Sequence, residues 1–285
     1  MTRSLTHYIG GEAVAAETPG ASLNPSNTDE VVARYPVAGA AEVDAAVMAA
    51  RTAFPAWAEA SPEVRSDLLD KVGATIMARA AELGELLSRE EGKTLAEGKG
   101  EVMRAARIFN YFAGEALRRH GQTLDSTRPG IDVATYREAV GVFALIAPWN
   151  FPIAIPAWKA APALAFGNTI VLKPASATPA IAHALAAIIH ECGAPPGVFN
   201  LVIGESNVGA ALVDHPEVDG ISFTGSQTVG ARVAEGAVRR QARVQLEMGG
   251  KNPLVVLDDA DLDRAVACAI DGGFYGTGQR CTASS

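Results

Sequence analysis

The chain carries one cysteine in a setting that favours nucleophilic chemistry. Cys281 lies in the segment Gly-Gln-Arg-Cys-Thr, directly after Arg280 and close to Gly276 and Gly278. The thiolate is the nucleophilic form of cysteine, and a neighbouring cation stabilises it. A lone cysteine also packs well as a small buried hydrophobe, so both interpretations stay open until other residues are considered.

Polar groups with functional potential follow four short apolar runs. The segments are Pro148-Trp149-Asn150-Phe151-Pro152, Lys173-Pro174-Ala175-Ser176, Thr224-Gly225-Ser226 and Glu247-Met248-Gly249-Gly250-Lys251. Each has a plain alternative: Asn150 can cap a helix, Lys173 can be solvated, and Thr224-Gly225-Ser226 can simply start a helix. Glu247 stands between apolar neighbours, and a partly buried carboxylate usually needs a partner or a function.

The apolar runs alternate with helical segments from Gly141 onward. Alternation of this kind predicts an α/β fold, a doubly wound parallel sheet with crossover helices. The predicted strands are 142–147, 169–173, 199–202, 220–223, 244–246 and 254–257, and the predicted helices are 153–166, 179–192, 208–213, 229–240 and one from Asp261 onward. Ligands of such sheets bind beyond the carboxyl ends of the strands, where the four polar segments stand.

The first third of the chain is helical in pattern. Val43, Val47 and Ala50 recur at helical spacing, Ser61-Pro62-Glu63 is typical of a helix start, and an apolar stripe from Leu68 to Leu87 fits one or two further helices. Another helix is predicted from about Thr94 to Arg119. Residues 122–138 then predict a projecting hairpin, whose unpaired edges favour pairing with a second subunit.

Composition excludes several classes of function. A net charge of −8 and a pI near 5.2 disfavour a nucleic-acid partner, which would need clustered Lys and Arg. The 285 residues hold no apolar run of membrane-spanning length and no signal peptide, so no membrane partner is expected. The three cysteines lack disulfide or metal-ligand spacing, which predicts a cytoplasmic protein without a metal site.

The motifs together resemble the aldehyde dehydrogenase superfamily, in the family's own order. The resemblance rests on the segments 148–152, 223–226, 246–251 and 278–281, reinforced by Glu91-Gly92-Lys93-Thr94 and by residues 197–202. It implies an NAD(P)-binding domain formed by residues 1–120 and 141–248, an oligomerisation hairpin at 121–140, and the start of a catalytic domain at 249–285. Family members continue well beyond the nucleophile, so we expect a partial sequence that is poorly soluble or inactive alone, from a full-length homodimer or homotetramer.

The resemblance also implies a reaction, the NAD(P)-dependent oxidation of an aldehyde to a carboxylate. Cys281 would attack the carbonyl carbon, while the Asn150 amide and the Cys281 backbone N–H would stabilise the oxyanion. Glu247 would be the general base that hydrolyses the thioester. Relatives that transfer the acyl group to coenzyme A tend to lack this acid, so a free carboxylate product is favoured.

Cofactor binding is implied in the same way. Lys173 would bond the adenosine ribose, and Gly225 with Ser226 would meet the pyrophosphate at a helix N-terminus. The further cofactor positions are Ile146, Trp149, Ser176, Gly209, Phe223, Thr224, Met248 and Gly249. NAD-preferring members usually have Glu three residues after the lysine, where this chain has Ser176, so NADP should be tolerated or preferred.

The substrate is less well defined by the sequence. Trp158 stands where one succinate semialdehyde subgroup has an arginine, which argues against that subgroup. Ser176 and the Gly-Gln-Arg-Cys-Thr-Ala context resemble 2-oxoglutarate semialdehyde dehydrogenases. Arg280 would then aid an anionic substrate or, alternatively, orient its loop through a salt bridge. Another aldehyde dehydrogenase, a coenzyme A-acylating enzyme and a non-catalytic dinucleotide-binding protein remain alternatives.

Overall fold

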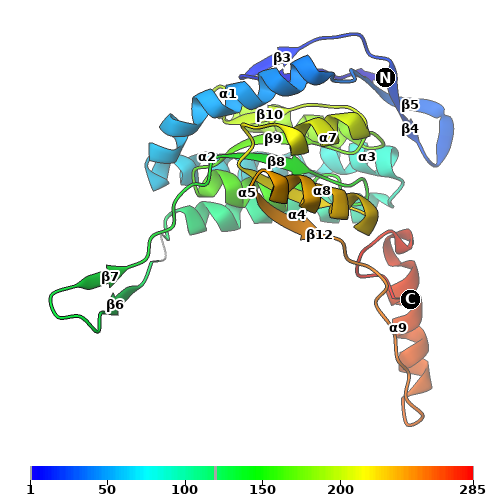
Figure 1. Cartoon of the computed structure of the whole chain (residues 1–285). Coiled ribbons are helices and arrows are strands. Elements are labelled where there is room, and N and C mark those ends of the chain that lie inside the picture. Colours follow the sequence, from blue (N-terminus) through cyan, green and yellow to red (C-terminus); the bar gives the residue numbers. More distant parts are fainter. Residues whose placement is uncertain (1, 119–120, 285) are drawn as a thin grey trace.

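A seven-stranded sheet forms the centre of the computed structural model, which describes residues 2–118 and 121–284 (Figure 1). The strand order is β12-β11-β8-β9-β10-β2-β3. The bounds are β8 Val142–Ile146, β9 Thr169–Lys173, β10 Phe199–Leu201, β11 Gly220–Thr224, β12 Arg243–Glu247, β2 His7–Ile9 and β3 Glu12–Val14. From β12 to β10 all pairs are parallel, and the chain runs outward from β8 to β10 before returning to β11. This confirms the predicted doubly wound sheet and places its switch point between β8 and β11.

Helices cover both faces of the sheet. One face carries α1 Ala40–Glu59, α7 Ser206–Asp214 and α8 Gln227–Arg239. The other face carries α5 Ala154–Ala165 and α6 Pro179–Glu191. Outside α5 and α6 lie α2 Pro62–Ala78, α3 Ala80–Glu91 and α4 Leu95–Ala116. Strand side chains alternate between the two cores, because successive residues of a strand point to opposite faces. Leu145 and Leu172 join the core under α5, whereas Ala144 and Val171 join the core under α1.

Helix starts follow the predicted capping signals. Ser61 caps α2 by accepting a hydrogen bond from the Val64 amide at 3.3 Å, with Pro62 in the first turn. Thr94 and Glu97 form a capping box at the start of α4. That helix ends at Ala116, and the predicted end at Arg119 lies outside the described residues.

The regular elements between residues 3 and 35 are strands, so the prediction that the first third is helical in pattern is wrong there. β1 Arg3–Ser4, β5 Asn27–Tyr35 and β4 Gly20–Asn24 make a three-stranded sheet, while β2 and β3 extend the central sheet in antiparallel fashion. β2 pairs with β10, and the Gly10 amide donates to the Asn200 side chain at 2.9 Å. Pairing partners almost 200 residues apart leave no periodic signal in a three-residue strand.

The predicted hairpin is present and projects from the body of the protein (Figure 1). β6 Thr123–Asp125 pairs antiparallel with β7 Asp132–Ala134, and every residue of both strands is exposed. Gly130 has φ 75°, in the left-handed region that suits glycine in a turn. Leu124, Ile131 and Tyr136 expose apolar surface on this arm.

The C-terminal segment departs from one prediction. Leu254–Leu257 is not a strand: these four residues are 39% to 73% exposed, and an isolated bridge joins Asn252 to Ser284 instead. Apolar residues form a strand only where a neighbouring strand offers hydrogen bonds, and none lies beside this segment in the described part of the chain.

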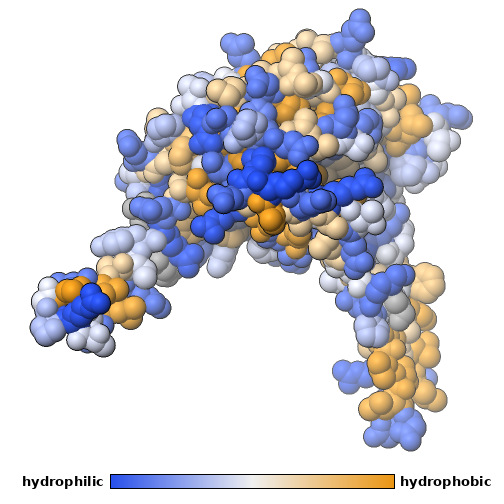
Figure 2. All heavy atoms as spheres, viewed as in Figure 1, coloured by the Kyte–Doolittle hydropathy of each residue, from blue (hydrophilic) through white to orange (hydrophobic). Residues whose placement is uncertain are grey.

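The helix expected after Asp261 is confirmed as α9 Leu262–Phe274, followed by the 3-10 turn Tyr275–Gly278. Its apolar residues lie on the surface, seen as orange spheres on the projecting C-terminal part in Figure 2. Over residues 2–118 and 121–284, no helix is long and apolar enough to cross a bilayer, and no group of three His, Cys, Asp or Glu could hold a metal ion.

Candidate active site

Predicted residues from separate strand ends meet around Cys281. The Asn150 Nδ2, in the connection between β8 and α5, donates a hydrogen bond to the Gln279 carbonyl at 2.8 Å. On the β12 side, a Cβ atom built on Gly249 would lie 3.3 Å from the Cβ of Cys281. The exposed Cys281 is therefore next to both the Asn150 segment and the segment that follows Glu247.

The loop that carries Cys281 is shaped by its own residues. Gly276 and Gly278 have φ values of 63° and 69°, which a glycine adopts without strain. Arg280 Nη2 donates to the carbonyls of Asp271 at 2.8 Å and Gly272 at 3.1 Å, near the end of α9. Arg280 thus orients the loop, as one sequence interpretation proposed, but through backbone carbonyls rather than through a salt bridge.

Glu247 is exposed at the end of β12 and is connected to a buried lysine by two polar side chains. Gln245 Nε2 donates to Glu247 Oε1 at 2.9 Å, and Ser222 Oγ donates to Gln245 Oε1 at 2.6 Å. Lys159 Nζ, on α5, donates to Ser222 Oγ at 2.8 Å. Burial lowers the pKa of Lys159 to about 8, and the Glu247 carboxylate opposes that shift. Sequence reasoning missed Lys159, although a single lysine within the apolar helix 153–166 was the available signal.

Lys93 holds the backbone of Asn150 through a hydrogen bond to its carbonyl. Its buried Nζ donates to the Asn150 carbonyl at 2.5 Å and to Glu101 Oε2 at 2.7 Å, and it lies 3.9 Å from the centre of the Phe151 ring. Glu91 stands 3.6 Å from the same ammonium. Burial raises the pKa of Glu91 to about 7, with Lys93 opposing the shift. The Glu-Gly-Lys-Thr segment was noticed only as part of the family resemblance, and its contact with Asn150 was not foreseen.

The N-terminal half of α4 connects the two loops of the site. Glu101 Oε1 accepts hydrogen bonds from the amides of Ile153 at 3.2 Å and Ala154 at 3.1 Å, and so caps α5. Glu97 Oε1 accepts from the Gly276 amide at 2.9 Å, in the turn before Cys281. Two acids one helical turn apart therefore position both the Asn150 loop and the Cys281 loop. Neither acid was predicted as a site residue.

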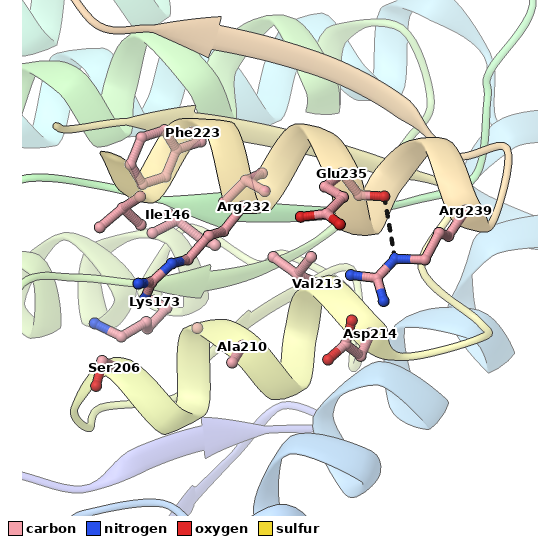
Figure 3. A pocket seen from close by; sticks show the side chains of 13 residues that line it. Ile146, Lys173, Ser206, Ala210, Val213, Asp214, Phe223, Arg232, Glu235 and Arg239 are labelled. Atoms are coloured by element: carbon pink, nitrogen blue, oxygen red, sulfur yellow. Dashed lines mark hydrogen bonds between the residues drawn. The ribbon is translucent and has the colours of Figure 1, made fainter. Parts of the chain in front are cut away.

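A cavity of about 430 Å³ lies between α7 and α8 at the carboxyl edge of the sheet (Figure 3). Of the predicted cofactor residues, Ile146, Lys173, Gly209 and Phe223 line it. The remaining lining residues are Ser206, Ala210, Val213, Asp214, Val229, Arg232, Val233, Glu235 and Arg239. Burial lowers the pKa of Lys173 to about 8, with the carboxylate of Glu205 opposing. Apolar walls with a cation at one end suit an adenosine group.

The other predicted cofactor residues lie around that cavity rather than in its lining. Ser226 caps α8 by accepting from the Val229 amide, and Met248 packs against Gly230 of the same helix. The Gly225 N–H donates to the Glu247 carbonyl at 3.1 Å, and its predicted contact with a pyrophosphate stays a prediction. The geometry of a helix start leaves the amides just after Ser226 as anion donors.

Three further predicted cofactor positions are placed as follows. Thr224 pairs with Glu247 across β11 and β12, and Trp149 is 44% exposed just before Asn150. Ser176 Oγ donates to Glu205 Oε2 at 3.0 Å.

Fold and site thus define a doubly wound α/β protein with an exposed cysteine loop next to Asn150 and a cavity of about 430 Å³ between α7 and α8. The model of the aldehyde dehydrogenase family matches residues 13–285, and the chain belongs to this family. It is 42% identical over 282 residues to the alpha-ketoglutaric semialdehyde dehydrogenase of Bacillus subtilis, covering 98% of this chain and 58% of the relative.

Solved structures show the same relation. An NADP-dependent enzyme of E. coli superposes with a TM-score of 0.95 at 39% identity, covering 99% of this chain and 59% of that one. An NAD-dependent aldehyde dehydrogenase of Sinorhizobium meliloti superposes with a TM-score of 0.94 at 39% identity, covering 98% and 57%. The chain spans a little under three fifths of the length of these proteins.

Lys93→Met should destabilise the protein strongly. The change leaves the buried Glu101 without its cation, and removing one partner of a buried ion pair costs about 3–5 kcal/mol. Urea titration gives the free energy of unfolding. Lys71→Met, at an exposed position of α2, is the control and should stay within about 0.5 kcal/mol of wild type. Equal unfolding midpoints for Lys93→Met and wild type would contradict the role of this pair.

Lys159→Met should stabilise the protein at pH 7 by up to about 3 kcal/mol. The pKa of Lys159 falls from its ordinary 10.5 to about 8 on folding, so the unfolded chain binds this proton more tightly. The resulting penalty is complete below pH 8 and disappears as the pH rises from 8 to 10.5.

Thermal or urea unfolding from pH 7 to 10 measures the difference between Lys159→Met and wild type, which should shrink as the pH rises. Lys71→Met should show a small difference that does not change with pH. A gain from Lys159→Met that is the same at pH 7 and pH 10 would contradict the burial argument.

Proposed function

We propose that this protein oxidises an aldehyde to a carboxylic acid with NAD or NADP, through a covalent intermediate on Cys281. The observation that supports it best is the convergence at the cysteine loop, where the Asn150 amide contacts the Gln279 carbonyl and Gly249 lies against Cys281. These residues come from three separate parts of the chain. A fold without this chemistry has no need to bring them together.

Each residue of the site has a separate role in the proposed reaction. Cys281 as thiolate attacks the aldehyde carbon. The Asn150 amide has two N–H groups, and one is donated to Gln279, so the other is available with the Cys281 backbone N–H to stabilise the oxyanion. A bound nicotinamide cofactor would supply the acceptor for the hydride that leaves the thiohemiacetal, so that a thioester remains on Cys281. Glu247 then takes a proton from the water that hydrolyses the thioester.

The cavity between α7 and α8 is the proposed adenosine site. Ile146 and Phe223 supply apolar walls, and Lys173 supplies a donor for ribose hydroxyls. An NADP-dependent and an NAD-dependent relative fit the fold almost equally well. The preference for NADP that Ser176 suggests therefore stays a prediction from sequence.

2-Oxoglutarate semialdehyde is the proposed substrate. The name of the Bacillus subtilis relative agrees with the resemblance carried by Ser176 and the Gly-Gln-Arg-Cys-Thr-Ala context. Another semialdehyde, or a general aldehyde, is the alternative within the same chemistry. A panel of semialdehydes with each cofactor tests it: the highest kcat/KM should fall on the five-carbon 2-oxo acid, and a higher value for an uncharged aldehyde would reject it.

The hairpin is the proposed contact with a second copy of the protein, in a homodimer or homotetramer. Its strands have unpaired edges, and Leu124, Ile131 and Tyr136 are 46% to 82% exposed. Strand edges of this kind are normally covered in native proteins. The division into a cofactor-binding domain of residues 1–120 and 141–248, the hairpin and a catalytic segment from 249 onward is part of the same proposal.

Glu247→Gln should stop the reaction at the thioester. Gln cannot accept the proton from water, so acyl-enzyme on Cys281 accumulates when aldehyde and cofactor are added, and steady-state turnover falls by about 10²–10⁴-fold. Intact-mass spectrometry with peptide mapping measures the adduct. It should be absent in Cys281→Ser and present in Cys268→Ser, because Cys268 is also free and exposed but lies on α9.

Unchanged turnover in Glu247→Gln would reject Glu247 as the general base. A wild-type protein that binds the cofactor but never forms an adduct at Cys281 would favour the non-catalytic alternative.

A further inference from the structure

A carboxylate from another loop lies beside Ser176. Glu205 stands between β10 and α7, directly before Ser206 of the cavity lining. Its Oε2 accepts a hydrogen bond from Ser176 Oγ at 3.0 Å, and its Oε1 accepts one from the Tyr35 hydroxyl at 3.4 Å. Glu205 does not cap its own helix with its side chain, so the carboxylate is directed to Ser176 and Tyr35.

The same carboxylate acts on Lys173. Glu205 raises the pKa of Lys173 against the effect of burial, so the two charges lie close enough to interact. Lys173 Nζ also donates to the Pro174 carbonyl at 2.8 Å, which holds the ammonium at this end of the cavity. An ammonium and a carboxylate within electrostatic reach of each other offer donors and an acceptor, as a pair of ribose hydroxyls requires.

A phosphate at the 2′ position would meet a different environment. It carries up to two negative charges and has no hydrogen to donate to a carboxylate when fully ionised. Like charges placed together at a binding site weaken binding, and solvent and salt reduce that effect. Glu205 therefore has the chemistry to accept the free hydroxyl and to repel the phosphate, although Ser176 has no charge.

We propose that Glu205 is a specificity-determining residue that makes this site favour NAD over NADP. This inference rests on the proposed function, because it places the adenosine ribose beside Lys173. It reverses the preference expected from Ser176 alone. The discrimination between NAD and NADP comes from Glu205, which lies 29 positions after Ser176 in the chain.

One charge in the same cavity opposes this effect. Arg232, on α8, lines the cavity, and its guanidinium extends toward the end where Lys173 and Ser206 lie (Figure 3). An arginine beside the ribose is the usual means of accommodating a 2′-phosphate. The test must therefore separate the contribution of Glu205 from that of Arg232.

Isothermal titration calorimetry of the 285-residue chain with NAD and with NADP tests the proposal. Wild type should bind NAD more tightly, and Glu205→Gln should lower the ratio of the NADP to the NAD dissociation constant by about tenfold or more. Glutamine keeps an acceptor for Ser176, and Glu205→Ala provides a second variant. Glu85→Gln, which changes the net charge equally at an exposed position of α3, should leave the ratio unchanged.

Two further measurements sharpen the result. Because Glu205 is exposed, raising the salt concentration should reduce the discrimination in wild type and have little effect on it in Glu205→Gln. A ratio that is unchanged in both Glu205 variants, or that changes only in Arg232→Gln, overturns the proposal. A folded chain that binds neither cofactor overturns the proposed cofactor site and this inference with it, whereas equal binding of both with an unchanged ratio overturns the role of Glu205 alone.

Discussion

The buried ammonium of Lys93 is the interaction on which the geometry of the site depends. A charge in the interior must be paired, and Lys93 satisfies this requirement with Glu101, the Asn150 carbonyl and the face of the Phe151 ring. Glu101 belongs to α4, whereas Asn150 and Phe151 belong to the connection between β8 and α5. Moving the lysine would leave a carboxylate unpaired in the core. The position of Asn150 is therefore set by an electrostatic requirement in addition to local loop conformation.

The second acid of α4, Glu97, extends this constraint to the loop that carries Cys281. Glu97 holds the Gly276 amide, and Gly276 begins the turn that leads to Cys281. Asn150 and Cys281 are thus positioned from one helix, although 131 positions separate them in the chain. A helix is a rigid reference, so tying both loops to α4 restrains the spacing between Asn150 and Cys281. The capping box of Thr94 and Glu97 supports the site, because it fixes the first turn of α4, where Glu97 lies.

How much the sequence predicted depended on whether the signal was local. The alternation of short apolar runs with helical segments after Gly141 is a local pattern, and it located the sheet, the strand ends and the residues Asn150, Lys173 and Glu247. β2 depends on β10, a partner far along the chain, so periodicity could not reveal it. Leu254–Leu257 was predicted to be a strand and is not one. Apolar composition indicates that a strand is possible, but it does not show whether a neighbouring strand is present to pair with it. Lys159 was missed because the sequence does not show that Ser222 and Gln245 connect this buried lysine to Glu247.

The Glu205 carboxylate beside Ser176 shows that a functional group can come from a different position in the sequence than the family pattern predicts. A ribose hydroxyl interacts with a carboxylate at a point in space and is indifferent to the loop that supplies it. Position 176 lies on the connection after β9, and position 205 lies on the connection after β10; because β9 and β10 are neighbouring parallel strands, these connections emerge at the same edge of the sheet. A serine at 176 is short enough to leave room for the Glu205 side chain and can donate a hydrogen bond to it. Serine at position 176 carries no negative charge of its own. Its hydroxyl instead holds the negatively charged Glu205 side chain beside it.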